Sequence, residues 1–272
     1  MSTFGSTRPD AGSVTRAALA PDVRAAVGAP IVAQPAPVRI PEGWYDASLF
    51  DDGDLPALAA TGQEITAWGN SPLSQSGGKI VHTADVANYS AGYMQIQLDQ
   101  NVTEFGFVGS YPSKTGGGFS GGIAVVLPKT GWASGSLGSA GVHYVQYVNN
   151  WHISNWSGSA ESPMYVPETA WSTPLALATK HVTAFRLDRD AGTLEILLPT
   201  GERRTIANAL TASNTGKYVV MELYNVLQAH PSATIDAFWA ESGGNIMRNV
   251  MESRTDNATI VANRLHTTGW LS

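Results

Sequence analysis

Short runs of aromatic and β-branched residues follow one another from about residue 63 to residue 241, and this pattern predicts β-strands rather than helices. In the run 93–98, Met94, Ile96 and Leu98 fall on one face and two glutamines on the other, which is the period of a half-buried strand. The pattern predicts about eleven strands. They are expected at residues 65–68, 79–83, 93–98, 103–109, 122–127, 142–148, 150–156, 181–188, 193–198, 217–224 and 233–239.

Many short strands cannot bury their apolar faces singly, so they must stack as two sheets or close into a barrel. Turn sequences such as Asp190-Ala191-Gly192 separate them at short intervals, which favours antiparallel connections. We therefore expect an all-β protein, a two-sheet antiparallel jelly-roll sandwich that occupies residues 58–241.

The segment before the sandwich, residues 1–57, is expected to be an arm with a short helix and a proline-rich strap. Residues 21–27 suit a two-turn helix, because Pro21 fits a first helical position and Gly28 a position just past the end. Residues 29–42 contain four prolines, which impose extended geometry. Neither piece is stable alone, so we expect contacts with neighbouring subunits through apolar side chains of this arm, namely Val23, Val27, Ile31 and Val38.

The last segment, residues 242–272, changes from strand to helical periodicity. Apolar residues from Ile246 to Leu265 recur at three- and four-residue spacing, which predicts a partly helical segment. We expect it to pack on a partner or on the sandwich, with Ile246 and Val250 as further assembly contacts.

The composition narrows the possible partners. Charged residues make up 14% of the 272 residues and there are eight tryptophans, which suggests a surface partly covered by partners or ligand. The net charge of −6 argues against nucleic-acid binding, which needs clustered basic residues. No run of 18 apolar residues predicts a membrane span, and residues 1–13 lack the features of a secretory signal, so we expect synthesis in a cytoplasm.

Catalytic motifs are weak. The string 118–122 matches G-x-S-x-G, but a glycine-rich loop precedes Ser120 and a strand follows it, where a serine hydrolase needs a helix. No strand carries the acids spaced two apart that a retaining glycosidase on such a sandwich would show. Glu195 and Glu222 remain as the carboxylates for an alternative hydrolase function.

Metal and cofactor sites are not expected. The absence of cysteine excludes thiolate sites, and the six histidines form no metal-binding pair in sequence. The acids Asp46, Asp51, Asp52 and Asp54 do not match a calcium loop, so we expect a solvated acidic turn there.

A carbohydrate-binding platform is the better-supported site. Aromatic rings match the C–H face of a sugar, and polar neighbours orient its hydroxyls. The candidate residues are His143, Trp151, His152, Trp156, Glu222 and Tyr224. The alternative is that alternate rings of the two aromatic strands fill the sandwich core.

Five segments, 150–156, 172–175, 181–187, 198–202 and 220–224, resemble minor tail proteins of tailed phages that infect mycobacteria and related actinobacteria. The resemblance covers roughly residues 60–241, and the string 21–30 is similar to the N-terminal region of such proteins. It implies a concanavalin A-like lectin or glucanase sandwich in the virion tail tip. It supplies no catalytic residues, and the chain lacks the paired acids of the glucanases and the calcium motif of legume lectins.

These observations predict a structural component of a phage tail tip that presents a lectin-like sandwich to host cell-envelope glycans. The expected partners are other tail proteins, in a homotrimer or ring, with a cell-wall glycan as ligand. The alternatives are a cell-envelope polysaccharide hydrolase, a lectin outside the virion, and a purely architectural virion protein.

Overall fold

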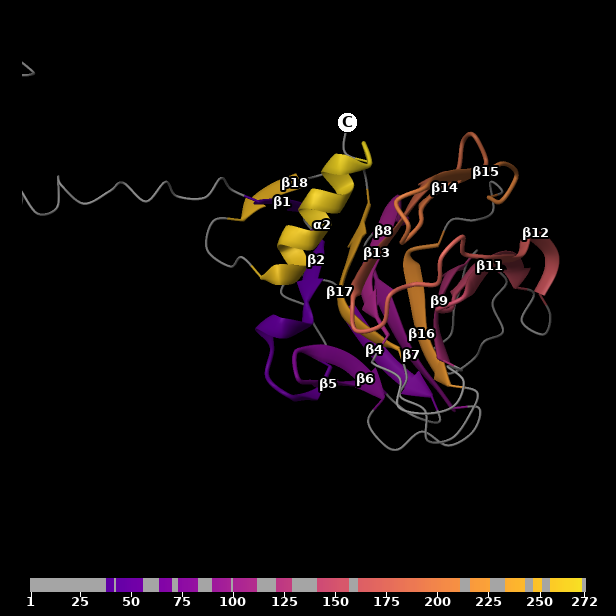
Figure 1. Ribbon diagram of the computed structural model, residues 1–272. Coiled ribbons are helices and arrows are strands. Elements are labelled where there is room, and N and C mark those ends of the chain that lie inside the picture. Colours follow the sequence, from indigo (N-terminus) through magenta and orange to yellow (C-terminus); the bar gives the residue numbers. More distant parts are fainter. Residues whose placement is uncertain are drawn as a thin grey trace, which may run out of the picture. The chain divides into compact units, whose positions relative to one another are not determined.

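The computed structural model describes the strands, the C-terminal helix and many of the connections between them (Figure 1). The described residues are 38–41, 43–55, 64–69, 73–82, 90–98, 100–111, 121–128, 141–156, 161–210, 216–225, 233–242, 247–250 and 255–270. The predicted helix at 21–27 and the assembly contacts Val23, Val27, Ile31 and Ile246 lie outside them. Val38 and Val250 are described as strand positions only.

One layer is a seven-stranded antiparallel sheet within the described residues, in the order β12-β11-β10-β9-β16-β7-β4. Along the chain its strands are β4 (Glu64–Gly69), β7 (Ser90–Gln97), β9 (Gly121–Pro128), β10 (Gly141–Gln146), β11 (Asn150–Trp156), β12 (Glu161–Ala170) and β16 (Tyr218–Asn225). Every pairing in this layer is antiparallel.

The other layer is a nine-stranded sheet in the order β15-β14-β13-β8-β17-β6-β5-β3, with β2 paired to β17. Its strands are β2 (Trp44–Asp46), β3 (Gly53–Asp54), β5 (Leu73–Ser76), β6 (Lys79–His82), β8 (Glu104–Ser110), β13 (Lys180–Asp188), β14 (Thr193–Leu197), β15 (Arg203–Ile206) and β17 (Thr234–Glu241). The remaining elements are β1 (Val38–Pro41), the 3-10 turn η2 (Ala47–Leu49), β18 (Met247–Val250) and α2 (Asp256–Thr267). All eleven predicted strands are present, so the expected two-sheet antiparallel sandwich is confirmed.

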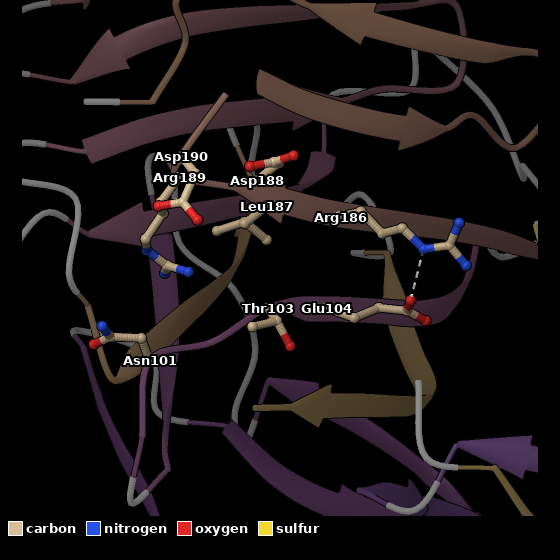
Figure 2. Close-up of a pocket in the computed structure, with 8 residues that line it drawn as sticks. All are labelled: Asn101, Thr103, Glu104, Arg186, Leu187, Asp188, Arg189 and Asp190. Atoms are coloured by element: carbon tan, nitrogen blue, oxygen red, sulfur yellow. Dashed lines mark hydrogen bonds and ion pairs between the residues drawn. The ribbon is translucent and has the colours of Figure 1, made fainter. Parts of the chain in front are cut away.

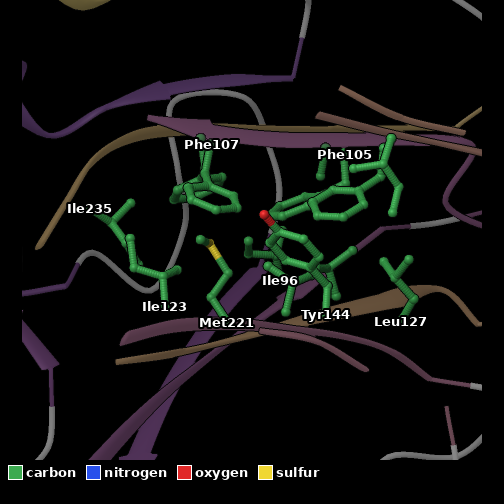
Figure 3. Close-up of a cluster of buried hydrophobic side chains, with 14 of the residues drawn as sticks. Ile96, Phe105, Phe107, Ile123, Leu127, Tyr144, Met221 and Ile235 are labelled. Carbon is green, nitrogen blue, oxygen red and sulfur yellow. The ribbon is translucent and has the colours of Figure 1, made fainter. Parts of the chain in front are cut away.

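The main hydrophobic core fills the space between the two sheets (Figure 3). Phe105 and Phe107 of β8 enter it from the nine-stranded sheet, and Tyr144 and Met221 enter from the seven-stranded sheet. The rings of Tyr144 and Phe185 meet edge to face with centroids 5.1 Å apart. Side chains from alternate positions of both sheets thus interdigitate, as sheet packing requires.

A second core lies on the outer face of the nine-stranded sheet, under α2 (Figure 1). Ala258, Val261 and Leu265 of the helix and the following Trp270 are almost fully buried against this face. A C-terminal helix was expected to pack on a partner or on the sandwich, and the structure shows it packed on the sandwich. The helix begins at Asp256, with Thr255 as its N-cap.

The predicted helical stripe was wrong at its start. Residues 247–250 form β18, which pairs antiparallel with β1. Apolar positions three and four apart over so short a run do not separate a helix from a strand. The segment is a strand because the backbone of β1 supplies its hydrogen-bonding partners.

The buried carboxylate of Glu104 connects the second core to the sheet. Its Oε1 accepts hydrogen bonds from the indole nitrogens of Trp239 (3.1 Å) and Trp270 (3.3 Å). Its Oε2 accepts one from Nε of Arg186 (3.0 Å), whose guanidinium carbon lies 4.4 Å from the centroid of the Trp270 ring. This cluster of four side chains fixes the chain beyond α2 onto the outer face of the sheet.

Asp46 performs a similar role at the start of α2. Its carboxylate is 1% exposed and accepts hydrogen bonds from the Asn257 amide (2.8 Å) and the Thr255 hydroxyl. The expectation of a solvated acidic turn was thus wrong for Asp46, whereas Asp51, Asp52 and Asp54 are exposed. Ser48 supplies two local donors to Asp46, and the cap of the distant helix α2 supplies the others.

The described residues all belong to one compact unit, Pro37–Ser272. β2 and β3 fall within the predicted arm 1–57, and they pair with β17 and β5 of the nine-stranded sheet. The predicted division into an arm (1–57), a sandwich (58–241) and a C-terminal segment (242–272) remains a prediction.

The Glu104 cluster predicts a large effect of a small substitution. In Glu104→Gln the charge of Arg186 loses its buried anionic partner. The new amide nitrogen also faces one of the groups that donate to the Glu104 carboxylate. We expect the free energy of unfolding, measured by urea titration, to fall by about 3 kcal/mol. The matched control is Glu202→Gln, at the exposed pair with Arg204, where a change below about 0.5 kcal/mol is expected. Equal effects of the two substitutions would contradict the proposed importance of this cluster.

Asp236 predicts a pH effect. Burial raises the pKa of this 1% exposed carboxyl, and nearby Asp46 adds to the rise, while Lys79, the Ser110 hydroxyl and Lys180 act in the opposite direction. Since the folded pKa lies above the unfolded one, the ionised group destabilises the fold at neutral pH, and this penalty disappears as the group is protonated.

Asp236→Asn is therefore expected to unfold at a higher urea concentration than the unsubstituted chain at pH 7. The difference should shrink as the pH falls toward about 4, where the unfolded carboxyl also takes up its proton. Asp54→Asn, on an exposed strand end, is the control. A less stable Asp236→Asn variant at pH 7 would mean that attraction to Lys79 outweighs the cost of burial.

Candidate functional site

The outward face of the seven-stranded sheet carries three of the six predicted site residues, namely His143, His152 and Glu222. On β10, Val142 and Tyr144 point into the core, so His143 between them points outward. On β11, Trp151 and Ile153 point inward, so His152 points outward. The two histidines therefore share one face, as neighbouring positions on paired strands.

Three rings form a cluster on this face, which we call the ring cluster: His143, Tyr147 and His152. The imidazoles of His143 and His152 meet edge to face with centroids 6.3 Å apart. The Tyr147 ring lies 6.4 Å from that of His152. His143 and Tyr147 are partly exposed and His152 is 9% exposed, so the cluster lies partly at the surface.

Glu222 and Tyr93 stand on the same face, toward the other edge of the sheet. The strand register pairs them directly, and the Tyr93 hydroxyl is hydrogen-bonded to the Glu222 carboxylate. Burial raises the pKa of Tyr93, and the charge of Glu222 raises it further. Tyr93 is therefore protonated at neutral pH and donates to the carboxylate.

The register places His152 and Glu222 in one row across the sheet. Between them stand Val145 of β10 and Ala124 of β9, both buried. The row spans three strand spacings, about 14 Å between the backbones of His152 and Glu222. Polar groups thus stand at both ends of a row whose two middle residues are buried.

The structure separates the predicted site residues. His143, His152 and Glu222 share the outward face. Trp151 does not, because it is 3% exposed and its ring stacks on Trp171 with centroids 5.9 Å apart. Trp151 is therefore a core residue, as the alternative interpretation of the aromatic strands had it. The side chains of Trp156 and Tyr224 lie outside the described residues.

Sequence reasoning missed Tyr93 as part of this face. The signal was present, because the sequence placed Met94 and Ile96 on one apolar face of a half-buried strand, and Tyr93 beside Met94 then falls on the opposite face. What the sequence could not supply was the pairing of β7 with β16, which sets Tyr93 opposite Glu222.

The carboxylates suggested for a hydrolase do not meet. Glu195 lies on the outer face of the nine-stranded sheet, where it pairs with Arg203 and Arg186. Glu222 lies on the outward face of the other sheet, so the sandwich separates the two. A retaining glycosidase needs its two carboxyl groups about 5 Å apart. Ser120 of the G-x-S-x-G string lies outside the described residues.

An open pocket of about 490 Å³ lies where β8 begins and β13 ends (Figure 2). Its charged lining is largely engaged in internal contacts: Arg186 pairs with Glu104, Arg189 donates to the carbonyl of Val102, and Asp188 accepts from the backbone of Ala191. Burial lowers the pKa of Arg189. Because these contacts hold the β13–β14 turn against β8, we assign the pocket a structural role.

Other kinds of site find no support in the described part of the chain. Within it, no three histidine, aspartate or glutamate side chains gather in a way that could hold a metal ion. None of its helices combines the length and the hydrophobicity needed to cross a bilayer.

No family model and no curated protein sequence matches this chain. Solved structures do match. The carbohydrate recognition domain of Emp47p superposes with a TM-score of 0.51 at 13% identity, over 75% of this chain and 96% of that chain. That of Emp46p gives 0.50 at 10% identity, over 66% and 88%. A legume lectin-like domain from Entamoeba histolytica gives 0.48 at 12% identity, over 65% and 90%.

At these identities the comparison establishes the fold. The expected concanavalin A-like sandwich is confirmed by the likeness to the two carbohydrate recognition domains with TM-scores of 0.51 and 0.50. The resemblance to phage tail proteins, beyond this fold, remains a prediction.

Proposed function

We propose that this protein binds carbohydrate through the outward face of its seven-stranded sheet. The observation that carries the proposal is the ring cluster of His143, Tyr147 and His152, which gathers polar rings on a partly exposed face of a lectin-like sandwich. The proposed role is non-catalytic, since Glu195 and Glu222 stand on opposite sides of the molecule.

The chemistry of this face suits a neutral glycan. Imidazole and phenol rings offer flat apolar surface to the C–H face of a sugar, and their ring nitrogens and hydroxyl exchange hydrogen bonds with its hydroxyls. The Glu222 carboxylate adds an acceptor farther along the same row, beside the Tyr93 hydroxyl. Rings at one end and a carboxylate at the other favour an oligosaccharide laid across the strands.

Two further lines support the proposal. The matched structures with TM-scores of 0.51 and 0.50 are described as carbohydrate recognition domains. The resemblance of residues 60–241 to minor tail proteins adds a biological setting. We accordingly propose that the protein is a component of a phage tail tip that adheres to host cell-envelope glycans, in a homotrimer or ring with other tail proteins.

The glycan proposal is tested with the full-length chain on a glycan array, followed by calorimetry with the best-bound oligosaccharide. We expect His143→Ala and His152→Ala each to weaken binding about tenfold or more, because each removes a ring from the cluster. His266→Ala, at an exposed histidine of α2, should bind normally. Thermal unfolding checks that the variants are folded. Binding of no glycan, or equal binding by all three variants, would contradict the proposal.

The virion setting has its own test. Antibodies raised against the full-length chain should label one end of the tail in electron micrographs of purified phage particles. Label on the capsid, or particles that carry none of the protein by mass spectrometry, would contradict a tail-tip location and leave the glycan proposal standing.

A further inference from the structure

A second pocket lies on the other side of the sandwich, between α2 and β13. It measures about 310 Å³, and its lining residues are Lys180, Val182, Ile260, Asn263, Arg264 and Thr267. Val182 belongs to the core under the helix, on the outer face of the nine-stranded sheet. The pocket is therefore separated from the ring cluster by both sheets.

The periods of β13 and α2 explain which of their residues line the pocket. On β13, Lys180 and Val182 are two apart and share the face turned toward the helix. On α2, Ile260, Asn263, Arg264 and Thr267 follow at spacings of three and four, so they lie along one side of the helix. The packing of α2 on the sheet thus builds the pocket from one strand face and one helix side.

The charge of this pocket is of one sign. Of its six lining residues, all within the described part of the chain, two are cationic and none is acidic. The chain as a whole has a net charge of −6, so a purely cationic pocket departs from the general composition. Two positive groups around one space attract an anion, and the protein surface focuses their field there.

Two titratable groups near the pocket, Asp236 and His181, do not change its positive charge. Asp236 acts on Lys180, but it is 1% exposed and is engaged by the Ser110 hydroxyl and by Lys79. The His181 ring nitrogen Nε2 contacts the carbonyl of Ala176, and burial lowers the pKa of this histidine. It therefore adds no positive charge of its own at neutral pH.

Arg264 is held in position and partly desolvated. Its Nη2 donates to the carbonyl of Pro199, and burial lowers its pKa. A guanidinium that has lost part of its hydration gains more from an anionic partner than a fully hydrated one. The contact with Pro199 also fixes the direction in which the remaining N–H groups point.

We propose that this pocket binds a small oxyanion, either the carboxylate of an acidic saccharide or inorganic phosphate. Lys180 and Arg264 neutralise its charge, and the Asn263 amide supplies a further donor. Val182 and Ile260 provide apolar contact for the rest of the ligand. This site is independent of the proposed glycan face, because it is built from the other sheet and from α2.

The test uses the full-length chain, isotopically labelled, at low ionic strength. Inorganic phosphate and glucuronate are titrated separately, with glucose as the neutral counterpart of glucuronate. We expect at least one anion to shift the amide resonances of α2 and β13, and glucose to leave them unchanged. Glucose binding at the ring cluster would shift resonances of β10 and β11 instead, so the two proposals are read out separately.

Lys180→Gln should weaken anion binding about tenfold, because it removes one of two charge-assisted contacts. The matched control is Lys217→Gln, at an exposed lysine outside the pocket, which should bind the anions as the unsubstituted chain does. Arg264→Gln is a weaker test, since it also breaks the contact with Pro199.

The outcomes are distinct. Shifts with phosphate alone, lost in Lys180→Gln, identify a phosphate site, and shifts with glucuronate alone identify an acidic-saccharide site. The proposal is overturned if neither anion shifts the α2 resonances. It is also overturned if Lys180→Gln and Lys217→Gln weaken binding equally, because the attraction would then be general to the surface.

Discussion

The arrangement of this protein depends on one buried carboxylate. Glu104 lies in the second core, 3% exposed, and a charge in such a place is tolerated only when donors surround it. Its donors come from three distant parts of the chain: Arg186 on β13, Trp239 on β17, and Trp270 after α2. Satisfying Glu104 therefore requires the C-terminal segment to lie on the nine-stranded sheet. Gly106 belongs to the same constraint, because a Cβ there would stand 2.1 Å from the Trp239 ring.

This constraint gives the two sheets different surfaces. The helix covers part of the outer face of the nine-stranded sheet with apolar side chains, so β8, β13 and β17 are buried on both faces, whereas β15 is exposed. The seven-stranded sheet keeps polar rings and the Glu222–Tyr93 pair on its outward face. The proposed glycan site lies on the outward face of the seven-stranded sheet. The proposed anion pocket lies on the other side, where α2 meets the nine-stranded sheet.

Prediction from the sequence succeeded for the central strands and for the edge strand β4, but it missed the edge strands β12 and β15. β12 contains Pro163 and Pro167 and lies at one edge of its sheet, where a strand tolerates residues that cannot donate. β15, at an edge of the other sheet, is short and begins with two arginines. Such features protect edges from unwanted pairing, and they also remove the hydrophobic alternation by which a strand is recognised.

The sequence by itself determined the central strands, their antiparallel stacking in two layers, and the fact that His143 and His152 lie on adjacent strands, because period-two alternation is a local property of the chain. It did not determine which of two alternating faces is buried. Trp151 and His152 are neighbours in sequence, and both were candidates for a sugar platform. The Trp151 ring points inward, where it packs against the rings of Trp171 and Tyr144. Likewise, the sequence around Asp46 does not indicate that its carboxylate is buried, because two of its donors, Thr255 and Asn257, come from the distant start of α2. Burial depends on what distant segments contribute, and only the tertiary structure brings those segments together.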